Sequence, residues 1–103
     1  MSTKILIIED DQDISEVLKL QLQLKRYTPI VASSYLEAQK HLADESIQLF
    51  LIDRMLPDSS GIDICKLLRT DQRHQDTPII LITAMAEPDN IVEGLDAGAD
   101  DYI

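Results

Sequence analysis

Short apolar runs alternate with longer amphipathic segments along this chain. We predict strands over residues 4–9, 28–33, 48–53 and 77–84, with 100–103 (DDYI) beginning a fifth. Several of these runs are apolar at consecutive positions, which is typical of strands buried on both faces of a parallel sheet. Pro29 lies inside the second run and places that strand at a sheet edge, because proline cannot donate a ladder hydrogen bond.

The segments between these runs have helical spacing. We predict helices over residues 12–27, 34–46, 61–71 and 87–102. The first would bury an apolar face, with Asp13 as a candidate N-cap; the residues of that face are Ile14, Val17, Leu18 and either Leu22 or Leu24.

The other predicted helices carry end signals or an apolar side. Ser34 and Glu37 form a capping-box pattern. Ile64, Cys65 and Leu68 share one side of the third helix. Pro88 in the first turn and Gly98 at the C′ position delimit the last helix.

Strands that alternate with helices predict an α/β fold with a doubly wound parallel sheet. In such a sheet, ligands bind at the carboxyl ends of the strands. The alternation by itself does not determine the order of the strands.

The composition limits the function. The 103 residues fit one domain, 1–103, and 19 acidic against 9 basic residues give a net charge of -10. This charge argues against binding to nucleic acid or to an anionic membrane. The lone cysteine, Cys65, excludes an intrachain disulfide and is expected in the core. The apolar run near the N-terminus is too short for a signal or a membrane span, so we predict a cytoplasmic protein.

Acidic residues follow two of the predicted strands. Glu9, Asp10 and Asp11 end the first, Asp53 ends the third, and Thr83 and Ala84 end the fourth. Taken singly, such acids are commonly helix caps or turn residues. Gathered at one sheet edge they would repel one another unless a cation joined them. Mg²⁺ suits a site with few carboxylates that also accepts phosphate oxygens.

Four motifs resemble the receiver domain of two-component response regulators. They are ILIIEDD, LIDRMLPDSSG, ILITA and GADDYI, in the family's order and at its spacing over the whole chain. The resemblance implies a flavodoxin-like receiver fold with strand order 2-1-3-4-5, its last strand incomplete and its last helix absent. It also implies a switch that promotes its own phosphorylation and dephosphorylation, rather than a turnover enzyme.

The resemblance also implies roles for individual residues. Asp53 would accept a phosphoryl group from a sensor histidine kinase. Asp10 and Asp53 would bind Mg²⁺ directly, Met55 through its main-chain carbonyl, and Glu9 through water.

Two further residues would respond to phosphorylation. Thr83 would hydrogen-bond the phosphoryl group, and Tyr102 would be the aromatic side chain that follows the shift of Thr83. The motifs look most like receivers joined to a winged-helix DNA-binding domain, so the implied output is transcription, with DNA bound only by a domain outside this chain.

The sequence departs from the family at two places. The family's lysine would stand two residues after Ile103, so the chain is either a fragment or a complete protein whose uncovered sheet self-associates. The resemblance implies a subclass that dimerises through its fourth helix, fifth strand and fifth helix, and we expect association on the side of strand 4, helix 4 and strand 5. Ile91 and Glu93 stand where that subclass typically carries arginines.

Two other functions remain open. One is a receiver-like interaction module that works without phosphorylation, which only the absent lysine favours. The other is a phosphatase on a similar sheet, but that family has a second aspartate where this chain has Met55. We interpret His41 and His74 as surface residues, and Gly61 as the residue that lets the loop after Asp53 turn into the next helix.

Overall fold

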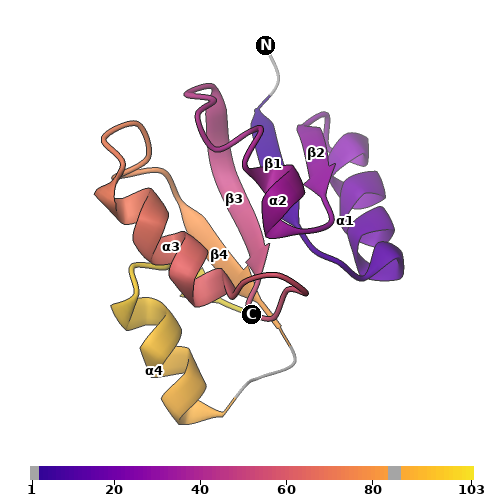
Figure 1. The fold of residues 1–103 in the computed structure, drawn as a ribbon. Helices are drawn as coiled ribbons and strands as arrows, with labels where there is room; N and C mark the ends of the chain where they lie inside the picture. The colour runs from indigo at the N-terminus through magenta and orange to yellow at the C-terminus, as the bar shows by residue number, and fades with distance from the viewer. Residues whose placement is uncertain (1–2, 84–86) are drawn as a thin grey trace.

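The computed structural model describes residues 3–83 and 87–103 as a three-layer α/β fold, shown in Figure 1. Its strands are β1 (Lys4–Ile8), β2 (Thr28–Ala32), β3 (Ile47–Asp53), β4 (Ile79–Ile82) and β5 (Asp101–Tyr102). Its helices are α1 (Gln12–Leu24), α2 (Tyr35–Ala38), α3 (Gly61–Thr70) and α4 (Pro88–Asp96). Ala84, at the end of the fourth predicted strand, lies outside the described residues.

All strand pairs are parallel, and the sheet order is β2-β1-β3-β4-β5. This confirms the predicted order and places β2, with Pro29, at an edge. β1, β3 and β4 are the inner strands, and in the first two of them Ile5 to Ile8 and Phe50 to Ile52 are buried. The prediction of strands buried on both faces is therefore confirmed for the two strands that lead to the acidic residues.

The sheet separates two apolar clusters. On one face, Leu6, Ile8, Phe50 and Ile52 pack with residues of α2, α3 and the segment after α4. On the other face, Ile5, Ile7 and Leu51 pack with residues of α1. Alternate residues of β1 thus point to opposite helical layers, as the two-residue repeat of a strand requires.

Helix α1 differs from the prediction in its cap, its length and its buried face. The N-cap is Asp11, not Asp13, because Asp11 Oδ1 accepts from the Asp13 and Ile14 amides at 2.9 and 3.2 Å. The helix ends at Leu24 because Arg26 adopts a left-handed backbone with φ 67°. The Arg26 and Tyr27 amides then close the last turn on Gln23 and Leu22. Leu18 and Leu22 face the sheet, whereas Ile14, Val17 and Leu24 are exposed.

The second helix is much shorter than predicted. Ser34 caps it as expected, accepting from the Glu37 amide at 3.2 Å, but the Glu37 carboxylate bonds to Ser33 rather than back to Ser34. After Ala38 the chain continues as turns. Asp44 accepts from the Ser46 amide at 2.9 Å and pairs with Lys4 Nζ at 2.9 Å, which gives the backbone an alternative to further helix.

His74 is buried, so its interpretation as a surface residue was wrong. Its Nδ1 lies 3.1 Å from Thr77 Oγ1, and its ring meets Phe50 edge-on with centroids 4.9 Å apart. The segment that carries it is held by Arg69, which donates to the carbonyls of His74 and Thr77 at 3.0 and 2.7 Å. Polar neighbours in the sequence concealed a position that the tertiary fold encloses. His41 is half-buried.

Gly98 and Gly61 serve different purposes. Gly98 has φ 113° and closes α4 as its C′ residue, as predicted. Gly61 has no left-handed backbone. A Cβ there would lie 2.5 Å from the Asp53 carbonyl oxygen and 2.9 Å from Arg54 Cα. The loop after Asp53 therefore needs a glycine because backbone packs on backbone, not because the chain must turn.

We expect Gly61→Ala to lower the free energy of unfolding by about 1–3 kcal/mol, since neither obstructing atom belongs to a flexible side chain. Urea unfolding followed by circular dichroism measures this change. Asp63→Ala, an exposed substitution in the first turn of the same helix, should cost no more than about 0.5 kcal/mol. Equal stability of Gly61→Ala and the wild type would contradict the backbone-contact explanation.

Candidate functional site

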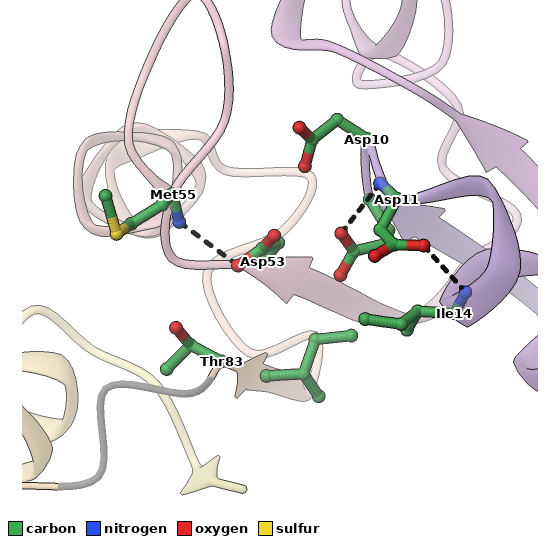
Figure 2. Close-up of a pocket in the computed structure, with 8 residues that line it drawn as sticks. Asp10, Asp11, Ile14, Asp53, Met55 and Thr83 are labelled. Carbon is green, nitrogen blue, oxygen red and sulfur yellow. Dashed lines mark hydrogen bonds between the residues drawn. The ribbon is translucent and has the colours of Figure 1, made fainter.

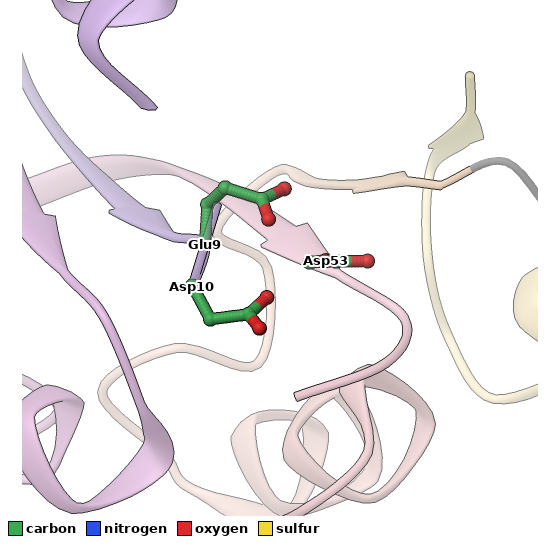
Figure 3. A group of neighbouring side chains, drawn as sticks. All are labelled: Glu9, Asp10 and Asp53. Atoms are coloured by element: carbon green, nitrogen blue, oxygen red, sulfur yellow. The ribbon is translucent and has the colours of Figure 1, made fainter. Parts of the chain in front are cut away.

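Three carboxylates meet at the carboxyl edge of the sheet. Glu9 and Asp10 follow β1, and Asp53 is the last residue of β3. One carboxylate oxygen of each lies within 4.8 Å of the others, and Figure 3 shows the three side chains around one space. The pairing of β1 with β3, with Ile8 opposite Ile52, produces this convergence.

The carboxylates line a pocket of about 480 Å³, shown in Figure 2. Its lining residues are Glu9, Asp10, Asp11, Ile14, Asp53, Met55, Ile82 and Thr83. Asp10 is exposed and Asp53 is half-buried, whereas Glu9 is only 4% exposed. The three acidic side chains thus lie at different depths in the pocket, and the pocket opens to solvent.

Glu9 is the most perturbed of these acids. Its pKa is raised from 4.5 to about 7, mainly by burial and in addition by the Asp53 and Asp10 side chains, while the hydrogen bond from the Asp11 amide opposes the shift. That amide donates to Glu9 Oε1 at 3.0 Å. Below about pH 7 Glu9 therefore carries a proton, because burial and the neighbouring carboxylates both disfavour its charged form.

The loop after Asp53 orients its carboxylate. The Met55 amide donates to Asp53 Oδ1 at 3.1 Å, as Figure 2 shows. The loop is closed by the Gly61 amide, which donates to the Arg54 carbonyl at 2.8 Å, and by a bridge between Met55 and Ser60. The Asp53 side chain is therefore held from both its strand and its loop.

Thr83 and Tyr102 lie in different environments. Thr83 follows β4, lines the same pocket as Asp53, and donates its amide to the Ile103 carbonyl at 3.0 Å. Tyr102 is paired with Leu81 and packs against the larger apolar cluster. A Cβ on Gly94 would lie 2.6 Å from Tyr102 Cδ2, so the ring rests directly on α4.

Asp11 lines the pocket and caps α1, a role that acids after a strand commonly have. Two further contributions around the site were not predicted. Asp58, in the loop after Asp53, accepts from the Tyr35 and Leu36 amides at 2.9 and 3.0 Å and so binds the start of α2. Arg54 is buried, although it follows the acidic residue directly. The partners of Asp58 and Arg54 lie 22 to 39 residues away in the sequence, so no local pattern could have identified these contacts.

Residues 5–103 match the response regulator receiver domain family. The chain belongs to this family. The receiver domain is 39% identical over 99 residues to the phosphate regulon transcriptional regulatory protein PhoB of Pseudomonas aeruginosa. It is 40% identical over 103 residues to the transcriptional regulatory protein SrrA of Staphylococcus aureus. These alignments cover 96% and 100% of the chain but only 43% and 42% of the two relatives.

Solved structures show the same fold. A putative response regulator from Chloroflexus aurantiacus superposes with a TM-score of 0.93 at 29% identity, covering the whole chain and 84% of that structure. The BeF3-activated N-terminal receiver domain of Klebsiella pneumoniae RstA gives 0.89 at 31% identity, covering 98% and 84%. In the described part of this receiver domain, no helix is long and apolar enough to cross a bilayer.

The raised pKa of Glu9 predicts how stability changes with pH. The folded protein binds a proton that the unfolded chain releases between about pH 4.5 and 7, so the free energy of unfolding should fall as pH rises through this range. The loss should be of the order of 3 kcal/mol without divalent cations. Chemical denaturation in EDTA at a series of pH values measures it.

Glu9→Gln should flatten this pH dependence, because the amide still accepts from Asp11 but carries no charge. Asp63→Asn, an exposed acid on α3, should leave it unchanged. An equally steep dependence in Glu9→Gln would show that another group causes it.

Proposed function

We propose that this chain is a phosphoacceptor switch that takes a phosphoryl group from a sensor histidine kinase onto Asp53. The observation that carries the proposal is the convergence of Glu9, Asp10 and Asp53 at the end of two inner strands. The family and the regulator names of its relatives support it.

The donor set fits Mg²⁺. It consists of carboxylate oxygens, which a hard divalent cation prefers, and one oxygen of each of the three acids lies within 4.8 Å of the others. Asp10 and Asp53 would hold the ion directly, with the Met55 carbonyl and, through water, Glu9. When bound, Mg²⁺ would offset the negative charge of the carboxylates and of the phosphoryl oxygens.

The chain's own residues would supply the nucleophile and its orientation. An Asp53 carboxylate oxygen attacks the phosphorus, a new O–P bond forms, and the P–N bond to the kinase histidine breaks, its electron pair remaining on the ring nitrogen. The Met55 amide orients the carboxylate through Oδ1. Little other covalent chemistry is needed, because phosphoryl transfer depends mainly on positioning and charge neutralisation.

Thr83 would detect the product. Its hydroxyl lies on the adjacent strand end in the same pocket, where it could donate to a phosphoryl oxygen. A shift of Thr83 would reach Tyr102 through β4 and β5, which are paired up to Ile103. The output we propose is transcription, through a domain outside this chain, and the chain itself would not be a turnover enzyme.

Incubation with a small phosphodonor and Mg²⁺ should add one phosphoryl group to the wild-type chain, measured by intact-protein mass spectrometry. Asp53→Asn should abolish the addition, because an amide is not a comparable nucleophile. Asp63→Asn is the matched control and should be phosphorylated normally. Incorporation that survived Asp53→Asn would exclude Asp53 as acceptor, and none in the wild type would favour a phosphorylation-independent interaction module.

Asp10→Asn should weaken Mg²⁺ binding at least about tenfold, since changes even to outer-shell partners of a metal site have effects of that size. Isothermal titration calorimetry measures the affinity, again with Asp63→Asn as control. Unchanged affinity in Asp10→Asn would remove this residue from the proposed ligand set.

A further inference from the structure

Arg54 is a buried cation directly beside the acidic pocket. Its side chain is 10% exposed, and it does not line the pocket. Its amide donates to the Ile82 carbonyl at 3.3 Å, and its carbonyl accepts from Gly61 at 2.8 Å. The backbone directly after Asp53 is therefore hydrogen-bonded on both sides of the residue that carries the guanidinium.

The guanidinium of Arg54 reaches α4. It donates to the Asn90 carbonyl at 3.1 Å and forms an ion pair with Glu93, which is 39 residues away in sequence. Residues 87–103 contain six acids and no lysine, arginine or histidine. The positive charge that meets Glu93 therefore comes from the loop after β3.

We propose that Arg54 is a positioning residue that couples the orientation of α4 to the placement of the Asp53 carboxylate. The coupling rests on the proposed function, since Asp53 is its proposed phosphoacceptor. A contact that draws Glu93 away would leave a buried guanidinium without its anionic partner, which is a costly state. The coupling is reciprocal, so a group bound at Asp53 must also change the free energy of the Arg54–Glu93 contact.

The charges of the two side chains determine the direction in which substitution of Glu93 changes the affinity for an anion. Glu93 neutralises Arg54 in this structure. Removing the charge of Glu93 leaves a net positive group beside Asp53, which favours an anion in the pocket. Glu93→Gln should therefore bind beryllofluoride, at saturating Mg²⁺, about 3- to 10-fold more tightly than the wild type.

The experiment compares wild type, Glu93→Gln, Arg54→Lys and the control Asp96→Asn, which removes a charge from the same helix. Glu93 is the less buried partner, with its side chain 59% exposed, so its substitution should not endanger folding. Arg54→Lys keeps the charge but loses the planar group that reaches both Asn90 and Glu93. Residue-resolved amide exchange is measured without ligand, and beryllofluoride affinity is measured with Mg²⁺.

The Met55 amide is the decisive readout, because it donates to Asp53 Oδ1 and lies outside α4. Glu93→Gln and Arg54→Lys should accelerate exchange in α4 and at Met55, and Asp96→Asn should accelerate neither. Glu93→Gln should also tighten beryllofluoride binding, and Asp96→Asn should change it less than about twofold.

Acceleration confined to α4 in both variants, with unchanged beryllofluoride affinity, would show a merely structural pair and overturn the proposal. Equal amide exchange rates and equal beryllofluoride affinities in Glu93→Gln and Asp96→Asn would also overturn the proposal. If the wild type bound no beryllofluoride, or bound it equally well after Asp53→Asn, the phosphoacceptor function would fail. The ligand-free exchange at Met55 would then still decide whether Arg54 couples α4 to Asp53.

Discussion

The crowding of carboxylates at the end of two buried strands is the constraint on which the rest of the site depends. The two faces of β1 and β3 pack in two different apolar clusters, so a slip of one residue would place each side chain in the cluster that it does not fit. Their register therefore holds Glu9, Asp10 and Asp53 together despite mutual repulsion. Burial, with this repulsion in addition, raises the pKa of Glu9 to about 7. Apolar burial elsewhere in the sheet supplies the stability that keeps such a site folded.

The loop after Asp53 connects the site to three helices. Gly61 packs on the Asp53 backbone at the start of α3, Asp58 accepts from the first amides of α2, and Arg54 pairs with Glu93 of α4. Each of these contacts is made by the backbone or by a side chain with a hydrogen-bond or ion-pair partner. Helices α2, α3 and α4 therefore all contact the short segment that follows Asp53. A change at the Asp53 carboxylate would act on a segment that contacts all three helices.

The sequence predictions succeeded where the signal was local and failed where it was not. The inner strands, the edge position of Pro29 and the glycine at the end of α4 follow from patterns of a few residues. The end of α1 was missed because Arg26 adopts a left-handed backbone that usually requires glycine. The length of α2 was missed because the chain continues as turns after Ala38, and Asp44 at the end of that segment bonds Ser46 and Lys4. His74 looked exposed because its sequence neighbours are polar, yet Phe50 and Thr77 enclose it.

The sequence by itself determined the alternation of strands and helices and the delivery of acids to one sheet edge, because apolar periodicity depends only on residue order. The resemblance to receivers supplied the strand order, which the structure confirms. Only the tertiary structure decided how deeply each acid lies and that Gly61 is required by close backbone contact. Only it paired Arg54 with Glu93. Those properties depend on groups far apart in the chain, and they exist only when the sheet brings them together.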